Sequence, residues 1–206
     1  MKINLPSYYS NWWTKFYIVC RNLILPLSDI DYFIPKNGLI YDIGCGFGVT
    51  SLYFALSSPD RKIIGFDICQ KRIRLAKLAG KNIRNLNFKI DNLIGNQHQM
   101  ANTIVIIDVL HHLNHQQKKL LLSQCHHLLF SRGKLIIKEI NNKPFIFFIW
   151  NYFHDLIFNF NLGSSLDFLN SKQMLNILNK YQFQVLNHHP LIRGPYSHYL
   201  YVCQKK

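Results

Sequence analysis

The sequence predicts an α/β fold in which a mostly parallel β-sheet lies between layers of helices. Five short apolar runs rich in β-branched residues have the length of strands, and helical patterns or loops separate them, as in βαβ units. An acidic residue directly follows each run. The 206 residues, 49% hydrophobic and 17% charged, predict one domain that buries a core without a disulfide or a metal. The runs lie at residues 39–41, 62–66, 87–90, 103–107 and 134–138.

Charge and cysteine usage exclude several classes of protein. The chain has 24 Lys and Arg residues against 10 Asp and Glu residues, which gives a net charge of +14. That charge attracts acidic partners, but it does not indicate whether the partner is nucleic acid, anionic lipid or an acidic protein. The five cysteines are scattered and never spaced C-x-x-C, which predicts reduced thiols in a cytoplasmic protein rather than a disulfide framework or a zinc ribbon. Neither a signal peptide nor a transmembrane segment is expected.

The first element expected is an amphipathic helix near the N-terminus. Its apolar residues recur at helical spacing against Asn11, Thr14, Lys15 and Arg21. An apolar stripe with this spacing is more often core than functional site, so packing of the helix against the sheet is one interpretation. The stripe comprises Tyr8, Tyr9, Trp12, Trp13, Phe16, Tyr17 and Cys20.

Five acidic residues end the strand-like runs. They are Asp42, Asp67, Asp91, Asp108 and Glu139. In a parallel sheet the ligand crevice lies at the carboxyl ends of the strands, so five carboxylates would meet at one edge. For any single acid, the preference of Asp for turns and helix caps is an alternative explanation. A row of acids in a basic protein favours a ligand that is rich in hydroxyls and carries positive charge.

A glycine-rich turn follows the first run and precedes a helix that is expected to reach Leu56. Residues 42–48 read Asp-Ile-Gly-Cys-Gly-Phe-Gly, a G-x-G-x-G pattern. Val49 stands where the third glycine of a dinucleotide fingerprint would be. The carboxylate of Asp42, beside the glycines, would repel a pyrophosphate but suits an ammonium or a sulfonium group.

Residues 42–48 resemble the first motif of class I S-adenosylmethionine-dependent methyltransferases. The later landmarks of that family follow in order: Asp67 lies 25 residues after Asp42, then come Asp91-Asn92 and the segment 108–113, Asp-Val-Leu-His-His-Leu. The resemblance covers residues 37–140, and residues 183–202 resemble the antiparallel sixth and seventh strands. It implies a three-layer Rossmann-like methyltransferase fold with a seven-stranded, mostly parallel sheet and an antiparallel last strand.

The same resemblance implies S-adenosyl-L-methionine as cofactor. The family places the ribose-binding acid at Asp67, adenine contacts at Asp91 and Asn92, and the methionine end of the cofactor near Asp108. These residues bind rather than react, so the rate should come largely from orientation and desolvation. The expected cofactor site comprises Asp42, Gly44, Cys45, Gly46, Gly48, Asp67, Ile68, Asp91, Asn92, Asp108 and Val109.

Candidate proton acceptors lie in two places. His111 and His112 follow the fourth strand, while His154 and Asp155 lie on the polar stripe of an aromatic-rich insertion over residues 141–161. The alternatives are that the first pair fixes the loop and that the second faces solvent on a packed or membrane-surface helix. No metal is expected, because His111 and His115 lack the intervening Glu of a zinc-protease helix.

The expected organisation is a single methyltransferase domain. Residues 1–36 form an N-terminal helical lid, 37–140 the cofactor-binding core, 141–170 a helical insertion that walls the acceptor pocket, and 171–206 a C-terminal helix and hairpin. The acceptor is expected to be a small apolar or aromatic molecule, free or on an acidic carrier protein. The segment 150–155 also resembles methyltransferases of polyene and polyketide pathways.

Alternatives to a small-molecule methyltransferase rest on the basic residues. The Lys and Arg residues between 71 and 89 are either a solvated helix face or a docking site for an acidic carrier protein or RNA. An RNA methyltransferase or RNA-binding protein is therefore the runner-up, although the sequence lacks the Asn/Asp-Pro-Pro-aromatic motif of base-amine methyltransferases. A membrane-surface-associated lipid methyltransferase is the other alternative.

Overall fold

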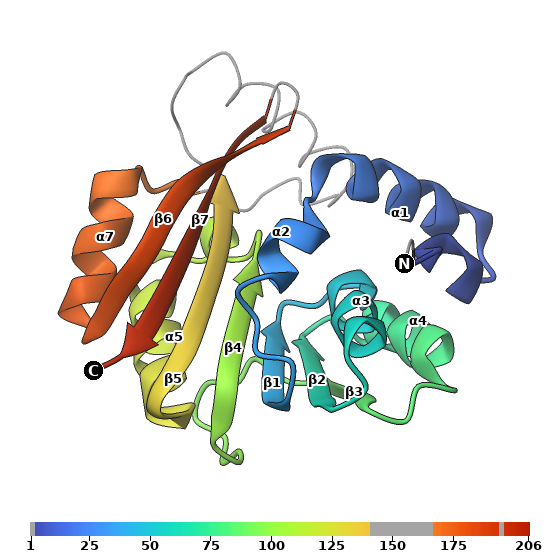
Figure 1. Ribbon diagram of the computed structural model, residues 1–206, viewed down its shortest axis with the longest axis horizontal. Helices are drawn as coiled ribbons and strands as arrows, with labels where there is room; N and C mark the ends of the chain where they lie inside the picture. Colours follow the sequence, from blue (N-terminus) through green and yellow to red (C-terminus); the bar gives the residue numbers. More distant parts are fainter. Residues whose placement is uncertain (1–2, 141–166, 194–195) are drawn as a thin grey trace.

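The structure, a computed structural model of the chain, describes residues 3–140, 167–193 and 196–206. A single seven-stranded sheet of order β3-β2-β1-β4-β5-β7-β6 runs through the molecule (Figure 1). All neighbouring pairs are parallel except those that β7 makes with β5 and β6. The predicted fold class, including the antiparallel last strand, is confirmed. The strands are β1 Gly38–Ile43, β2 Arg61–Asp67, β3 Leu86–Ile90, β4 Ala101–Ile107, β5 Leu129–Ile140, β6 Phe183–Arg193 and β7 Tyr196–Lys205.

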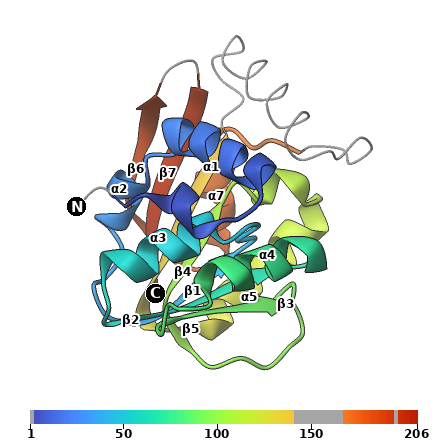
Figure 2. The same ribbon diagram turned by 90° about the vertical axis from the view of Figure 1, so that its right-hand side faces the viewer.

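Helices cover both faces of the sheet (Figures 1 and 2). One apolar core joins the sheet to α5 and α7, and a second joins the opposite face to α1, α2 and α3. A third, small cluster packs α4 on β3. The helices are α1 Trp12–Ile24, α2 Leu27–Asp31, α3 Val49–Ser57, α4 Gln70–Gly80, α5 His115–Leu128 and α7 Ser171–Lys180, with short 3-10 helices at Leu5–Tyr8 and Leu110–His112.

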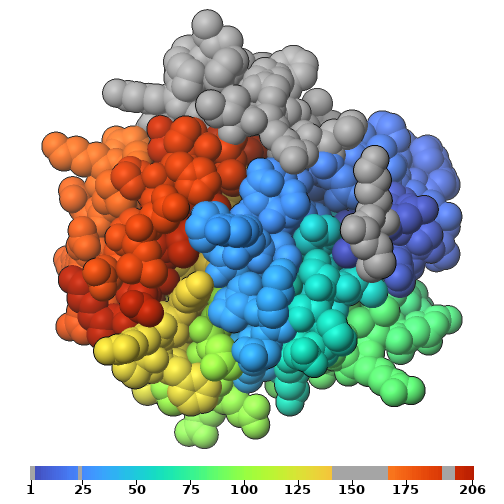
Figure 3. Space-filling model, in the orientation of Figure 1, coloured from blue at the N-terminus to red at the C-terminus, as the bar shows by residue number. Residues whose placement is uncertain are grey.

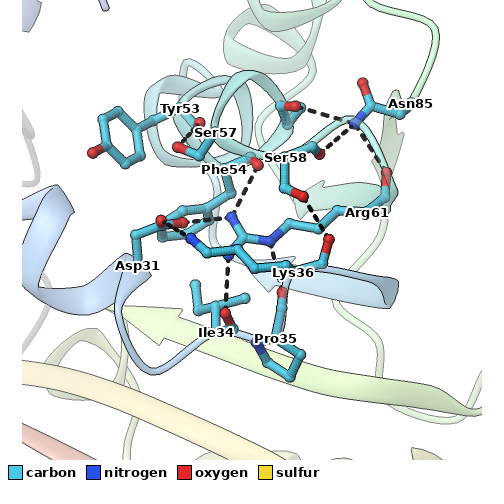
Figure 4. Close-up of polar contacts among 11 residues, drawn as sticks. Asp31, Ile34, Pro35, Lys36, Tyr53, Phe54, Ser57, Ser58, Arg61 and Asn85 are labelled. Carbon is cyan, nitrogen blue, oxygen red and sulfur yellow. Dashed lines mark hydrogen bonds and ion pairs between the residues drawn. The ribbon is translucent and has the colours of Figure 1, made fainter. Parts of the chain in front are cut away.

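A buried arginine fixes the segment that enters β1. The side chain of Arg61 is fully buried and forms an ion pair with Asp31 at the end of α2 (Figure 4). Its Nε donates to the carbonyl of Pro35 at 2.7 Å, and its Nη2 donates to that of Ile34 at 2.9 Å. A guanidinium carries five donors in a fixed fork, which matches these several acceptors. The chain from α2 to β1 is thereby held beside α3, and Figure 3 shows this blue segment between the C-terminal strands and the cyan surface of α3.

The strand ends differ from expectation at two of the five acids. Asp67 is the last residue of β2, and Asp91 and Asp108 follow β3 and β4, as expected. Asp42 and Glu139 instead lie one residue inside their strands, before Ile43 and Ile140. Because successive strand residues point to opposite faces, this position turns both carboxylates into the protein. In the described part of the chain no helix is long and apolar enough to cross a membrane.

Candidate active site

A cavity of about 440 Å³ lies at the carboxyl ends of the parallel strands. The helix α1 contributes to its wall through Tyr17 and Arg21. Nine of the eleven expected cofactor residues line it, whereas Asp42 and Gly48 do not. The nine are Gly44, Cys45, Gly46, Asp67, Ile68, Asp91, Asn92, Asp108 and Val109.

The three glycines of the turn have different roles, although all have a positive φ, between 56° and 78°. A Cβ on Gly44 would lie 2.3 Å from a methyl carbon of Val109, and one on Gly48 would lie 2.5 Å from the ring of Phe88. A Cβ on Gly46 would meet no atom within 4 Å. Gly44 and Gly48 therefore permit close packing of the turn, while Gly46 opens toward the ligand space.

Four main-chain N–H groups of the turn already have acceptors inside the protein. Those of Gly44 and Cys45 donate to the carbonyl of Phe66 at 2.7 and 2.9 Å. That of Gly46 donates to Oδ2 of Asp67 at 2.8 Å, and that of Gly48 to the carbonyl of Cys45 at 2.8 Å. A phosphate-binding turn presents such groups to its anion. This turn therefore fits a cofactor without phosphate, as S-adenosylmethionine is.

Asp67 is placed to bind two neighbouring hydroxyls. Its side chain lines the cavity while the residue is only 8% exposed. Oδ1 accepts from the N–H of Cys69 at 2.8 Å, and Oδ2 accepts from that of Gly46 at 2.8 Å. Each carboxylate oxygen has two acceptor sites, so each retains one for a ligand. A ribose diol matches this pair of sites, and its hydrogen bonds to a charged acceptor are of the strong class.

Asp91 and Asn92 follow β3 on the cavity wall. Oδ1 of Asp91 accepts from the N–H of Leu93 at 2.7 Å and from Nδ2 of Asn96 at 2.9 Å. These bonds fix the Asp91 carboxylate beside the cavity. Partial burial would raise the pKa of Asp91, but these bonds and nearby His98 lower it below its ordinary value.

Asp42 lies behind the turn instead of on the cavity wall. It is 1% exposed, and its Oδ2 accepts from the hydroxyls of Thr50 and Ser51, each at 2.5 Å. Burial raises the pKa of Asp42 to about 6, although the two hydroxyls oppose that rise. These contacts anchor the first turn of α3 to β1, because Thr50 and Ser51 belong to that turn.

A charged cluster occupies the cavity beyond the turn, at the end of β4. Oδ1 of Asp108 is 2.5 Å from Nζ of Lys138, and its Oδ2 is 3.7 Å from Nη2 of Arg21. Burial would raise the pKa of Asp108, but the charges of Lys138 and Arg21 lower it well below its ordinary value. Asp108 therefore stays ionised, and Arg21 connects α1 to it.

Two histidines border this cluster. His198 of β7 lines the cavity and is 5% exposed. Burial, and next the charge of Lys138, lowers the pKa of His198 to about 3, so its imidazole is neutral at ordinary pH. His112 also lines the cavity.

His111 is held behind the cavity wall. Its Nδ1 is 2.7 Å from Oε2 of Glu139, whose Oε1 accepts from the N–H groups of Val109 and Leu110. Its ring stacks on Phe168, with centroids 5.2 Å apart. The residue is 2% exposed and does not line the cavity. This geometry favours the interpretation that His111 fixes the loop, and it leaves His112 as the histidine of the pair that faces the ligand space.

Three residues of the cavity wall, Tyr17, Arg21 and Lys138, were not among the site residues expected from the sequence. The sequence did carry a signal for Lys138, because a lysine in a β-branched run that is expected to be buried needs a partner of opposite charge. In the structure Lys138 is 1% exposed and pairs with Asp108. His154 and Asp155 lie outside the described residues. Within the described ranges no group of three His, Cys, Asp or Glu residues is arranged to hold a metal ion.

Comparisons with known proteins agree with the geometry of the site. Residues 41–135 match a family model described as a methyltransferase domain. A SAM-dependent methyltransferase from Methanosarcina mazei is 18% identical, with a TM-score of 0.67 over 88% of this chain and 97% of that one. Magnesium protoporphyrin IX methyltransferase from Synechocystis, solved with bound S-adenosylhomocysteine, is 17% identical, with a TM-score of 0.71 over 96% of this chain and 89% of that one.

A third similar structure has a different name. The [4+2]-cyclase SpnF is 11% identical, with a TM-score of 0.70 over 87% of this chain and 79% of that one. No curated protein sequence matches the chain. The matching domain model, the sheet order and a turn suited to a phosphate-free cofactor agree: the chain contains a methyltransferase domain and has the fold of the class I S-adenosylmethionine-dependent methyltransferases.

Proposed function

We propose that this enzyme transfers the methyl group of S-adenosylmethionine to a small acceptor with an apolar or aromatic body. The observation that carries the proposal is the composition of the cavity wall around the end of β4 and β5. Leu25, Leu113 and Ile140 supply apolar surface there, next to the polar groups of His112 and His198. An apolar wall with few polar groups is typical of sites for small organic ligands.

The size of the cavity supports a small acceptor. Its volume of about 440 Å³ has to hold the cofactor and the reacting part of the acceptor together. Cavities of this size class bind drug-sized molecules. A similar structure is named as a magnesium protoporphyrin IX methyltransferase, which acts on an organic molecule rather than on a macromolecule.

The side chains that line the cavity position and polarise the cofactor and the acceptor, and they do not themselves carry the methyl group. S-adenosylmethionine supplies an electrophilic methyl group on a sulfonium centre. Asp67 orients the ribose, and Asp108, whose carboxylate is paired with Lys138 and Arg21, borders the space for the methionine end. His112 is our candidate for accepting a proton from the acceptor, because it faces the cavity and His111 does not.

Cofactor binding is tested by calorimetry with a ligand-side control. S-adenosylhomocysteine should bind the wild type about tenfold or more tightly than its 2′-deoxy counterpart, since one hydrogen bond to a charged group is lost. In Asp67→Ala both ligands should bind weakly and equally. Asp60→Ala removes an exposed acid before β2 and should behave as wild type. A hydroxyl preference that survives in Asp67→Ala, or preferential uptake of NAD, contradicts the proposal.

Methyl transfer itself is tested by the formation of S-adenosylhomocysteine. Because one structure of this fold is named as a [4+2]-cyclase, cofactor binding alone does not establish transfer. Phenols, amines and carboxylic acids with aromatic bodies should be offered free and as thioesters on an acidic carrier protein. Product with any free acceptor supports the proposal. Product only with RNA contradicts it. His112→Ala should lower turnover much more than cofactor affinity.

A further inference from the structure

The helix α1 exposes its largest apolar side chains. Trp12, Trp13 and Phe16 are 64%, 63% and 52% exposed, whereas Thr14 and Ile18 are buried at 6% and 0%. The rings of Trp12 and Trp13 stack with centroids 4.0 Å apart. The sequence pattern favoured packing of this aromatic stripe into the core, and the structure turns most of it outward. A contiguous exposed apolar patch marks an interaction surface.

A second surface, on α4, the loop that follows it and β3, carries only positive charge. Asp67 is the one acidic residue between Arg61 and Ile90, and it is buried in the active site. Among the residues that the structure describes, no acid forms an ion pair with the exposed cations of this surface. We call it the α4 cationic face; its exposed members are Lys71, Arg74, Lys77, Lys81, Arg84 and Lys89.

The helices α1 and α4, which carry residues of the two surfaces, lie on the same side of the molecule (Figure 2). A chain of ring contacts connects them at the cavity. The ring of Tyr17 meets that of Phe47 edge-on at 5.2 Å, and the guanidinium of Arg72 lies 5.7 Å from the centre of the Phe47 ring. Ile68 lines the cavity and is 76% exposed. Aromatic, apolar and cationic groups thus border one opening.

We propose that this side of the enzyme docks on an anionic lipid surface. Trp12, Trp13 and Phe16 enter the interfacial layer, and the α4 cationic face lies against the headgroups. Tryptophan prefers the membrane interface, and clustered Lys and Arg residues are attracted to anionic headgroups. RNA or an acidic protein would account for the cations but would leave Phe16 and Val19, the latter 47% exposed, without an apolar environment.

The insertion of α1 is tested by fluorescence in the Trp150→Phe background. The chain has three tryptophans, so this variant restricts the signal to Trp12 and Trp13. Vesicles of phosphatidylcholine with about one-third phosphatidylserine should shift the emission to shorter wavelength, and brominated lipid should quench it. Phosphatidylcholine alone should have little effect. Unchanged emission with the anionic vesicles overturns the proposal.

The contribution of each surface is tested by vesicle flotation with matched variants. Arg74→Glu/Lys77→Glu should weaken binding about 25-fold or more, at about fivefold for each cation removed. Lys172→Glu/Lys180→Glu changes the net charge equally on the distant helix α7 and should have little effect. Trp12→Gln/Trp13→Gln should abolish flotation, whereas Tyr32→Gln, at an aromatic residue that is 81% exposed outside the patch, should not.

Three results would overturn the docking proposal. They are equal losses in the α4 and α7 variants, flotation that survives without the two tryptophans, and a single-stranded RNA that binds through Arg74 and Lys77 while vesicles do not bind. The flotation variants, at Trp12, Trp13, Tyr32, Arg74, Lys77, Lys172 and Lys180, lie outside the cavity wall, so calorimetry should give the wild-type affinity for S-adenosylmethionine. That control shows that the variants are folded and separates this test from the test of methyl transfer.

Discussion

Replacing Asp42 by Asn should change how the stability of the protein depends on pH. Burial raises the pKa of Asp42 from its ordinary value of 3.8 to about 6 in the folded protein. The folded state therefore holds this proton more tightly than the unfolded state does. The contribution of Asp42 to stability is greatest below about pH 4 and is lost as the pH rises through about 6. A shift of about two units corresponds to about 3 kcal/mol.

The Asn side chain retains an oxygen that accepts from Thr50 and Ser51, but it carries no charge. The free energy of unfolding of Asp42→Asn, relative to wild type, should accordingly rise by about 3 kcal/mol between about pH 4 and about pH 7. Urea unfolding across this range measures the difference. The pKa of Asp108 is lowered in the folded protein, so Asp108 makes stability depend on pH in the opposite direction. This contribution is the same in wild type and variant and cancels in the difference between them. Asp60→Asn, at an exposed acid, should show no comparable rise.

The same variant tests whether Asp42 is an anchor or a ligand-binding residue. Because Asp42 does not line the cavity, Asp42→Asn should change the affinity for S-adenosylmethionine by less than about tenfold, the effect of a charge at a distance. A relative stability that is flat with pH, combined with loss of cofactor binding, would refute the reasoning. It would show that this carboxylate contacts the cofactor.

Two further changes probe packing. Arg61→Met leaves the Asp31 carboxylate without its buried partner, so the free energy of unfolding measured in urea should fall by about 3–5 kcal/mol. The control Lys62→Met, at an exposed lysine, should cost under about 0.5 kcal/mol. Equal effects of the two variants would disprove a structural role for the ion pair. Gly48→Ala, which drives a methyl group into an aromatic ring of β3, should lower the melting temperature more than Gly46→Ala. Gly46→Ala should cost about 1–2 kcal/mol for its left-handed backbone and weaken cofactor binding in calorimetry; the reverse order of melting temperatures would contradict this assignment.

The sheet and the part of the cavity wall at the strand ends were predictable because their signals are local. Strand-length apolar runs, each followed by an acid, gave five parallel strands, and the glycine turn with Asp67 and Asp108 gave part of the cavity wall. The orientation of the N-terminal helix was not predictable. Helical spacing shows that Trp12 and Phe16 share a surface, but not whether that surface faces the sheet or solvent.

The rest of the site depends on contacts between distant parts of the chain. Lys138 and His198 meet because β5 and β7 pair in a register that no local pattern encodes. Arg21 reaches Asp108 only through the packing of α1. The direction of the Asp42 side chain depends on where β1 ends. Because β1 continues by one residue to Ile43, Asp42 lies inside the strand, and the alternation of side chains along the strand turns it toward α3.

The internal hydrogen bonds of the glycine turn have a consequence for the energetics of ligand uptake. Since the amides of Gly44, Cys45, Gly46 and Gly48 already have acceptors within the chain, the turn keeps its shape without a bound molecule. The conformational entropy of ordering this backbone is lost when the polypeptide folds rather than at association. An incoming adenosyl compound thus meets a preorganised receptor and keeps more of its interaction energy as affinity.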